Sequence, residues 1–365
     1  MDALTLTREL IRLNTALDGE AAAAALIARR LEASGTATTV LEWRSGRHQL
    51  IARHGGDLDG TNRPVILTGH LDTVAVDTGS WTADPWGADV TDGWVYGRGS
   101  SDMKAGVAAL TVAFITHASR PHRCRGVHLL LTAAEETGCE GARQLADAMP
   151  ADPWAVIVAE PTANRLVLGH KGALWLRLSA HGRAAHGSRP ELGDNAALRL
   201  ARAVQDVVAA DIWPTHPQLG ASTVNVGTFH AGQQVNLVPH HAEAGLDIRS
   251  VPGVQHAALA RAVGTAAGAH VDVTPMLDLA PVLTDPAHPA AESMRAVLRE
   301  LGLTDDPLPG ATYFTDAAVL GGPALILGPG EPEQAHVTDE RCRVENIYAA
   351  CDVYTSLLDK ACAQH

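Results

Sequence analysis

Histidine and carboxylate side chains, which are ligands of catalytic metal ions, occur in five short motifs of this chain. In the first motif, His70 and Asp72 directly follow an apolar run, Val65 to Thr68. Open α/β sheets bind ligands beyond the carboxyl ends of their strands, where His70 would lie. Asp72 could accept the other imidazole N–H and so fix the tautomer of His70. The alternative is a surface loop with an incidental histidine, because short motifs often occur by chance.

A glycine-rich turn, Gly97 to Gly106, carries Asp102 at the start of a predicted helix. Asp102 could be the N-cap of this helix, and the glycine loop could bind a phosphate. The Walker spacing is absent, however, and a carboxylate in the turn would repel a phosphate. A cation therefore suits the turn better, and the two oxygens of Asp102 could bridge two metal ions.

Two adjacent carboxylates, Glu135 and Glu136, follow the apolar run Val127 to Leu131. Burying both is costly unless they are paired or bind a metal ion. Because neighbouring side chains point in different directions, one could bind the metal ion while the other serves as a general base. Taken alone, this motif fits an acidic helix N-terminus equally well.

The last two motifs place Glu160 after the apolar run Ala155 to Ala159 and His336 after the run Ala324 to Leu327. A single histidine in such a place is more often structural than a ligand. Four apolar runs nevertheless each lead to a histidine or a carboxylate, and the glycine-rich turn adds Asp102. His, Asp and Glu without Cys are typical of a catalytic zinc-type site rather than a structural one. Taken together, the motifs predict a metal centre.

The segments that must position these side chains alternate between strand-like runs and helical patterns. This alternation predicts an α/β fold with a mixed, largely parallel sheet sandwiched by helices. The middle of the chain differs, because Ala173 to Ala180 alternates apolar and polar residues, as a half-exposed strand does. The pattern there indicates four strands and two helices, so we expect an inserted α+β domain. The predicted boundaries are residues 1–172 and 280–365 for the metal-binding domain and 173–279 for the insertion.

The composition argues against several classes of protein. A formal net charge of −13 disfavours a nucleic-acid partner, because phosphate binding needs a cationic surface. The sequence has no uninterrupted apolar stretch of about 18 residues or more, so we expect no membrane-spanning helix. It also lacks the pattern of a secretory signal at its N-terminus. Its five cysteines are scattered and odd in number, which is typical of free thiols and predicts a cytoplasmic location.

The five motifs together resemble those of a family of co-catalytic zinc hydrolases. This family includes acetylornithine deacetylase, succinyl-diaminopimelate desuccinylase, aminoacylase and glutamate carboxypeptidase, and the resemblance covers nearly the whole chain. It rests on Gly-His-Leu-Asp-Thr-Val at His70, Gly-Arg-Gly-Ser-Ser-Asp-Met-Lys at Asp102, Ala-Glu-Glu-Thr-Gly at Glu135, Ala-Glu-Pro-Thr at Glu160 and Gln-Ala-His-Val-Thr-Asp-Glu at His336.

The resemblance implies two divalent metal ions, zinc first and cobalt or manganese as alternatives, in a zinc-peptidase-like catalytic domain. His70, Asp102 and Glu160 would bind one ion, and Asp102, Glu136 and His336 would bind the other. Glu135 would be the general base, Asp72 would orient His70, and the peptide bond between Asp102 and Met103 would be cis.

The inserted segment corresponds by resemblance to the family's lid or dimerisation domain. His186 matches a family histidine that reaches the active site of a neighbouring subunit, which implies a homodimer formed through the lid. Asn236 and Arg249 match positions that bind the substrate carboxylate, and Arg offers a planar fork suited to that group. An ion pair within the lid is the alternative for Arg249.

The expected reaction is removal of an N-acyl group from an amino acid by a hydroxide that bridges the two metal ions. The segments around Tyr313 and His336 look nearer to acetylornithine deacetylases than to desuccinylases. A dipeptidase or carboxypeptidase acting on a dipeptide, and a desuccinylase, remain alternatives. Outside this class, a non-catalytic metal-binding protein and a nucleotide-binding α/β enzyme remain alternatives, and only the latter would be insensitive to a chelator.

Overall fold

The computed structural model describes residues 1–16, 19–55, 63–120, 125–146, 149–150 and 152–363. By its packing, the chain divides into two compact units. The first unit comprises Met1–Gly169, Leu283–Pro309 and Thr315–His365, and the second comprises His170–Val282 and Gly310–Phe314. The short segment Gly310–Phe314 therefore packs with the inserted unit although it lies far along the chain.

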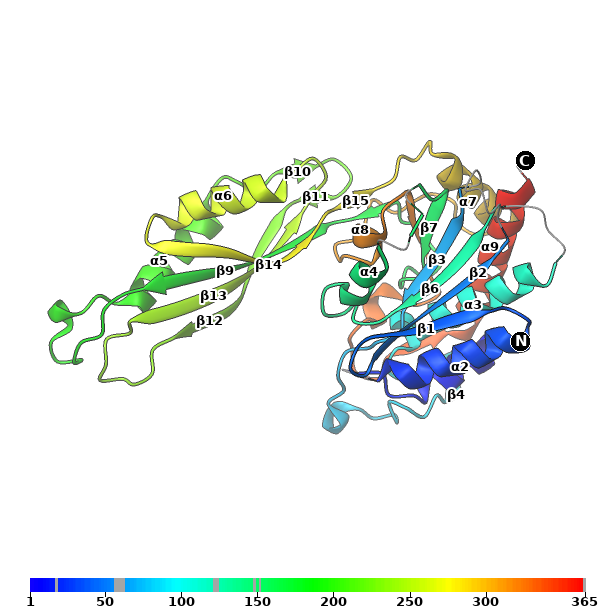
Figure 1. Ribbon diagram of the computed structural model, residues 1–365, viewed down its shortest axis with the longest axis horizontal. Coiled ribbons are helices and arrows are strands. Elements are labelled where there is room, and N and C mark those ends of the chain that lie inside the picture. Colours follow the sequence, from blue (N-terminus) through cyan, green and yellow to red (C-terminus); the bar gives the residue numbers. More distant parts are fainter. Residues whose placement is uncertain (17–18, 56–62, 121–124, 147–148, 151, 364–365) are drawn as a thin grey trace. The chain divides into compact units, whose positions relative to one another are not determined.

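A six-stranded sheet with the order β1-β2-β6-β3-β7-β16 forms the centre of the first unit (Figure 1). Strands β6, β3, β7 and β16 run parallel, and the hairpin of β1 and β2 joins β6 antiparallel. This arrangement confirms the predicted mixed, largely parallel sheet. The strands are β1 (Thr38–Arg44), β2 (Arg47–His54), β3 (Val65–His70), β6 (Val127–Thr132), β7 (Ala155–Val158) and β16 (Ala324–Ile326).

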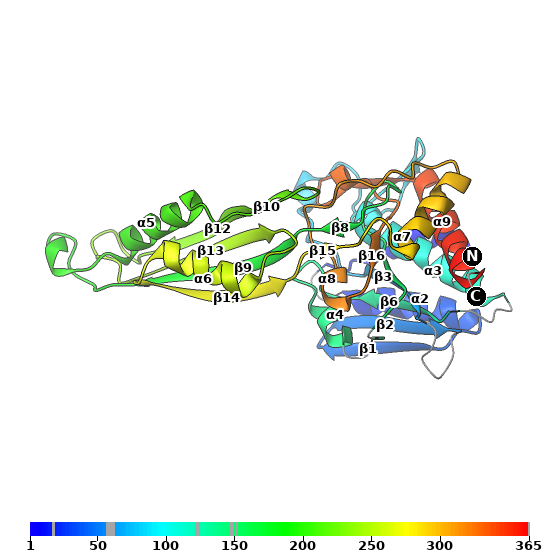
Figure 2. The ribbon, with the colours of Figure 1, turned by 90° about the horizontal axis from the view of Figure 1, so that it is seen from above.

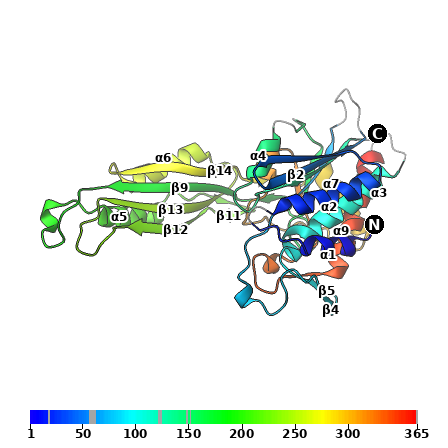
Figure 3. The same cartoon turned by 60° about the horizontal axis from the view of Figure 1, so that its bottom comes forward.

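Helices cover both faces of this sheet, as predicted. Five helices share one buried apolar cluster with one face: α1 (Ala3–Ile11), α2 (Glu20–Ala33), α3 (Ala105–Ala118), α7 (Pro289–Glu300) and α9 (Val344–Ala363). Figure 3 shows α1, α2, α3 and α9 gathered on that side. The short helices α4 (Glu140–Leu145) and α8 (Ala317–Leu320) lie on the other face. All six residues of β3 are buried, as expected for a central strand covered on both faces.

A second, smaller sheet and several turns complete the first unit. The sheet consists of β4 (Val90–Thr91), β5 (Trp94–Tyr96) and β17 (Arg341–Arg343), and it has the order β17-β5-β4. An irregular helical turn, η2 (Ser100–Lys104), leads into α3 and contains the cis peptide bond expected between Asp102 and Met103. Short 3-10 turns are η1 (Thr78–Ser80) and η5 (Pro332–Gln334).

The second unit is an α+β structure built on a four-stranded antiparallel sheet of order β12-β13-β9-β14. Its strands are β9 (Gly172–His181), β12 (Thr223–Ala231), β13 (His241–Ser250) and β14 (Val271–Leu279). Helices α5 (Ala196–Ala209) and α6 (His256–Ala267) pack on one face of the sheet (Figures 1 and 2). This confirms the α+β class predicted for the insertion.

Alternate residues of β9 and β13 are buried beneath the two helices, which matches the alternation in their sequence. Minor elements of this unit are β10 (Thr215–His216), β11 (Gly220–Ala221) and η4 (Pro190–Leu192). Strands β8 (Gly169–His170) and β15 (Val282–Leu283) lie where the chain passes between the units. Of the helices that the structure describes, none is both long and apolar enough to cross a membrane.

Candidate metal centre and active site

His70 is the last residue of β3, and its imidazole is buried at the carboxyl edge of the main sheet. Its Nε2 lies 3.1 Å from Oδ1 of Asp102 and 3.9 Å from Oε1 of Glu160. Its Nδ1 lies 3.0 Å from the backbone oxygen of Asp72. The backbone contact suits a tautomer with the proton on Nδ1, which leaves Nε2 free to bind a metal ion.

The turn that carries Asp102 is held close to the sheet. Gly106, at the start of α3, packs so tightly on the backbone of Ala159 that an added Cβ would lie 2.3 Å from the Ala159 oxygen. A side chain at this position would push α3 away from the strand that ends beside Glu160. Glycine at position 106 therefore helps to bring Asp102 and Glu160 to the same edge of the sheet.

Glu135 and Glu136 follow β6 and enter the same space from a second strand. The carboxylate of Asp72 accepts their two backbone N–H groups, at 3.2 Å each. Glu135 is buried, whereas Glu136 is partly exposed and reaches towards His336. The two neighbouring carboxylates thus occupy different environments, as expected for two side chains with different roles.

His336 completes the cluster from a loop near the end of the chain. Its Nε2 lies 3.0 Å from the Glu136 carboxylate and 3.3 Å from Oδ2 of Asp102, and 51% of its side chain is exposed. The two oxygens of Asp102 therefore face different histidines, His70 on one side and His336 on the other. The structure brings all five predicted metal ligands into one cluster within the first unit.

The electrostatics of this cluster favour positive charge at its centre. Burial raises the pKa values of Glu135 and Glu160 well above their usual range, and neighbouring carboxylates raise them further. Hydrogen bonds to Asp102 and Glu136 raise the pKa of His336 to about 10. So many buried carboxylates side by side are costly unless cations balance them.

The donor atoms are close enough to hold metal ions. Ligand atoms of His70, Asp102 and Glu136 all lie within 4.8 Å of one another, and so do those of His70, Glu135 and Glu160. A set of imidazoles and carboxylates without thiolates suits zinc, cobalt or manganese. The residues therefore fit a centre for divalent cations, and a buried glutamate, Glu135, lies beside it.

Asp316 is a further buried carboxylate at this edge that the sequence analysis did not select. It accepts a hydrogen bond from Oγ1 of Thr132 at 2.5 Å, and burial raises its pKa to about 6. It lies directly before the short helix α8, in the segment around Tyr313 whose sequence bears only on the predicted substrate class. An acid before a short apolar helix does not differ locally from a surface acid, and the partner of Asp316, Thr132, lies 184 residues away along the chain.

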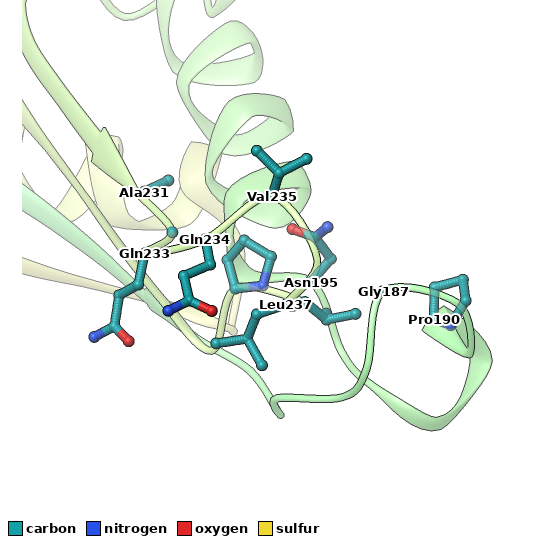
Figure 4. A pocket seen from close by; sticks show the side chains of 11 residues that line it. Gly187, Pro190, Asn195, Ala231, Gln233, Gln234, Val235 and Leu237 are labelled. Atoms are coloured by element: carbon teal, nitrogen blue, oxygen red, sulfur yellow. The ribbon is translucent and has the colours of Figure 1, made fainter.

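In the second unit, the structure brings His186 and Asn236 together. The N–H of Gly187 donates to the backbone oxygen of Asn236 at 2.7 Å, and His186 forms a β-bridge with Leu237. The two loops line a cavity of about 580 Å³, which Figure 4 shows with Asn195 and Gln234 at its wall. Nδ1 of His186 accepts the N–H of Ser188 at 3.1 Å, which suits a tautomer with the proton on Nε2.

Arg249 lies elsewhere in the second unit, on β13. Its guanidinium pairs with Asp247 at 3.0 Å and stacks over the ring of Phe314, 5.1 Å from the ring centre. Asp247 also accepts the indole N–H of Trp175 at 3.0 Å. The ion pair weighed as an alternative in the sequence analysis is therefore present. It leaves about a quarter of the arginine side chain (25%) exposed.

The chain resembles known proteins in both its sequence and its fold. Residues 66–360 match the model of peptidase family M20/M25/M40. A succinyl-diaminopimelate desuccinylase of Cereibacter sphaeroides is 30% identical over 98% of both chains. An acetylornithine deacetylase of Vibrio parahaemolyticus is 29% identical over 88% of this chain and 87% of its own.

Among solved structures, an M20 family metallo-carboxypeptidase of Sulfolobus solfataricus superposes with a TM-score of 0.81. The alignment covers 99% of each chain at 18% sequence identity. The two proteins therefore share the whole two-unit fold, although most of their residues differ.

Proposed function

The chain belongs to peptidase family M20/M25/M40, which confirms the resemblance seen in its motifs, and we propose that it is a two-metal hydrolase that removes an N-acyl group from an amino acid. The family and the deacetylase and desuccinylase relatives make it a metal-dependent hydrolase, as the sequence predicted. We also propose which metal ions bind, which role each residue has and what the substrate is.

One observation carries the proposal: Asp102 faces His70 with one oxygen, at 3.1 Å, and His336 with the other, at 3.3 Å. A carboxylate between two imidazoles is suited to bridge two cations. His70, Asp102 and Glu160 would hold one ion, and Asp102, Glu136 and His336 would hold the other. Zinc fits this donor set, with cobalt or manganese as alternatives.

Two such cations, when bound, would act as Lewis acids that lower the pKa of water and polarise the substrate carbonyl. The protein residues provide the proton transfers. Glu135, buried and fixed through its backbone by Asp72, would take a proton from the attacking water and deliver it to the leaving amine. Burial raises the pKa of Glu135, which suits a group that must both accept and release a proton near neutral pH.

His186 would stabilise the negative charge that develops on the carbonyl oxygen, with its Nε2–H as donor. We propose that it acts in the active site of a second copy of the chain, in a homodimer formed through the inserted unit. Strand β12 supports this, because it is the edge of its sheet, is exposed along most of its length and presents Val226 and Phe229. An exposed apolar edge strand is a common pairing surface.

Asn236 and Arg249 would bind the carboxylate of the substrate. Both are accessible polar side chains of the inserted unit, and Arg249 already binds a carboxylate, that of Asp247. A substrate carboxylate could replace Asp247 as its partner. The preferred substrate is an N-acetyl amino acid such as acetylornithine. The alternatives are a succinyl-diaminopimelate-type substrate, which the desuccinylase at 30% identity supports, and a dipeptide.

We further propose a cytoplasmic location and no nucleic-acid partner. Cys139, Cys342 and Cys351 are free cysteines, which is the usual state in a reducing compartment. The formal net charge of −13 would repel a phosphate backbone.

A panel of substrates tests the proposal. N-acetyl amino acids, N-succinyl-diaminopimelate and dipeptides would be assayed with and without a chelator, followed by addition of zinc, cobalt or manganese. We expect hydrolysis of at least one N-acyl amino acid, its loss with the chelator and its recovery with metal. Metal binding without turnover of any compound would favour the non-catalytic alternative, and turnover of dipeptides alone would favour a peptidase.

A further inference from the structure

Glu340 is a buried carboxylate outside the metal cluster for which the proposed reaction has no use. Its side chain is 0% exposed and accepts four hydrogen bonds of 2.9 Å or less. The donors are the guanidinium of Arg98 at 2.6 Å and the backbone N–H groups of Gly99, Ser101 and Asp102 at 2.9, 2.7 and 2.9 Å. One carboxylate thus holds the backbone of the whole turn that carries Asp102.

Glu340 also belongs to the loop that carries His336, the histidine that faces Asp102. It lies four residues after His336, and its own backbone oxygen accepts the N–H of Gly97 at 2.8 Å. The residue before it, Asp339, accepts the backbone N–H groups of Thr82 and Ala83 at 2.9 and 3.0 Å. Two consecutive carboxylates therefore fasten the His336 loop to other parts of the first unit.

The two loops come from parts of the chain that are more than 200 residues apart, yet their ligands must meet within a few tenths of an ångström to share a cation. Nε2 of His336 lies 3.3 Å from Oδ2 of Asp102, and neither residue lies on a strand or in the regular part of a helix. Four short bonds to a buried charge are a much stiffer connection than the loops themselves provide. Arg98, itself buried, balances the charge of Glu340.

We propose that Glu340 is a positioning residue that sets the distance between Asp102 and His336 and thereby the affinity of the site for its second cation. This inference rests on the proposed two-metal function and adds a residue that touches neither metal ion nor substrate. Residues that hold metal ligands in place typically change metal affinity about 10- to 100-fold when they are replaced.

The test compares Glu340→Gln with a control, Glu331→Gln. Glu331 lies at the same turn but contacts the hydroxyl of Ser101 and the amide of Asn346 rather than the turn backbone. Cobalt(II) would be titrated into the metal-free proteins, with visible absorption and calorimetry giving the two stepwise affinities. We expect Glu340→Gln to weaken the second affinity about tenfold or more, and Glu331→Gln to leave both affinities within about twofold of wild type.

Replacing Glu340 alone leaves Arg98 buried without its partner, which could unfold the chain. The double variant Glu340→Gln/Arg98→Met removes both charges and keeps the test decisive. If Glu340 positions the turn, the second affinity stays weak in the double variant even where the melting temperature recovers. If Glu340 is merely structural, affinity and melting temperature recover together, and the inference is wrong.

Hydrogen exchange of the metal-free proteins gives a readout that needs no cation. The amides of Gly99, Ser101 and Asp102 should exchange faster than in wild type in both Glu340 variants. In Glu331→Gln their exchange rates should equal those of wild type. A wild-type chain that binds fewer than two cations would contradict the proposed function. Two bound cations with equal affinities in wild type and Glu340→Gln would contradict the positioning role alone.

Discussion

The imidazole of His70 is oriented by the backbone of Asp72 rather than by its carboxylate: Nδ1 lies 3.0 Å from the Asp72 backbone oxygen and 3.7 Å from Oδ1. The carboxylate instead accepts the N–H groups of Glu135 and Glu136. Behind it, the guanidinium of Arg47 lies 3.9 Å from Asp72 and 2.5 Å from Glu20. The Asp72 side chain thus connects the candidate general base to buried charges of β2 and α2.

The sequence predicts that the Asp72 carboxylate orients His70, whereas in the structure this carboxylate contacts the backbone of Glu135 and Glu136. Because the backbone orients His70, Asp72→Ala should leave the first cation bound, whereas Glu135 and Glu136 lose their backbone anchor. We expect kcat to fall about 10- to 100-fold with a smaller change in KM. Steady-state kinetics together with metal analysis of the purified variant measure both effects. Loss of the first cation with Asp72→Ala would show that the carboxylate does orient His70.

Replacing Glu135 tests the proton transfer directly. Glu135→Gln keeps the shape of the side chain but cannot accept a proton, so turnover should fall at least about 10²-fold while both cations stay bound. Metal content by mass spectrometry and single-turnover kinetics would be measured on the same sample. Glu140→Gln is a control, because Glu140 is also a glutamate after β6 but contacts Arg44 and Thr137 outside the cluster. Comparable turnover in Glu135→Gln would remove Glu135 from its proposed role.

The convergence of ligands was predictable because strand order and ligand position are linked. His70 ends one strand of the parallel set, and Glu135 and Glu160 follow two others, and parallel strands end at one edge of the sheet. Asp102 lies on a turn and His336 on a loop beyond β16, so the strand pattern indicates the sheet edge that His336 approaches but not that it meets Asp102. The resemblance of their motifs to those of a known family could predict this contact. A matching motif carries information about distant contacts that composition and hydrophobic patterns lack.

Other features could not be predicted for physical reasons. Strand β1 carries charged residues such as Glu42 and Arg44, because it is an edge strand that is partly exposed, and its pattern resembles that of a loop. Glu340 and Asp316 are buried carboxylates whose partners lie more than 180 residues away. Nothing in their local sequence distinguishes them from surface acids until packing defines their neighbours.

Arg249 should act on substrate binding rather than on the chemical step. Arg249→Ala removes the planar fork that would bind a substrate carboxylate, so KM should rise about tenfold or more while kcat changes little. Arg177→Ala is the matched control, because Arg177 lies on the adjacent strand β9 and is exposed. The comparison of an N-acyl amino acid with its amide, which lacks the carboxylate, gives a second check. If the KM for the acid is unchanged in Arg249→Ala, Arg249 does not bind the substrate carboxylate and serves only in its ion pair with Asp247.

Histidine burial in the second unit predicts an acid-dependent loss of stability. Burial lowers the pKa of His170 from its usual 6.5 to about 4. Since the unfolded chain binds this proton more readily, His170 contributes fully above its unfolded pKa, and its contribution falls as the pH drops towards 4. We expect it to account for about 2 kcal/mol of the stability lost between about pH 7 and pH 5.

Urea unfolding of metal-free wild type and His170→Asn at the two pH values measures this contribution. Asparagine retains a donor for the backbone oxygen of Lys171, which His170 contacts at 2.8 Å, but does not titrate in this range. The variant should therefore lose about 2 kcal/mol less than wild type on acidification. Equal losses in both proteins would mean that His170 is protonated without cost in the folded state.

The proposed action of His186 across a dimer can be separated from action within one chain by mixing two inactive variants. His186→Ala lacks the oxyanion donor, and Glu135→Gln lacks the general base, so each homodimer should be nearly inactive. In a mixed dimer, one active site has an intact Glu135, and its partner supplies an intact His186. Random exchange of subunits produces mixed dimers as about half of all dimers, with one working site in each.

Activity should therefore return to about one quarter of the wild-type value after the variants are unfolded together and refolded, or are co-expressed. If His186 acts within its own chain, no combination places both groups in one site, and the mixture stays inactive. Sedimentation of the mixture establishes that dimers form, so that inactivity is not caused by lost assembly. If a monomer remained fully active, all of its catalytic groups would come from one chain. That result would contradict both the dimer and the contribution of His186 to the active site of the other subunit.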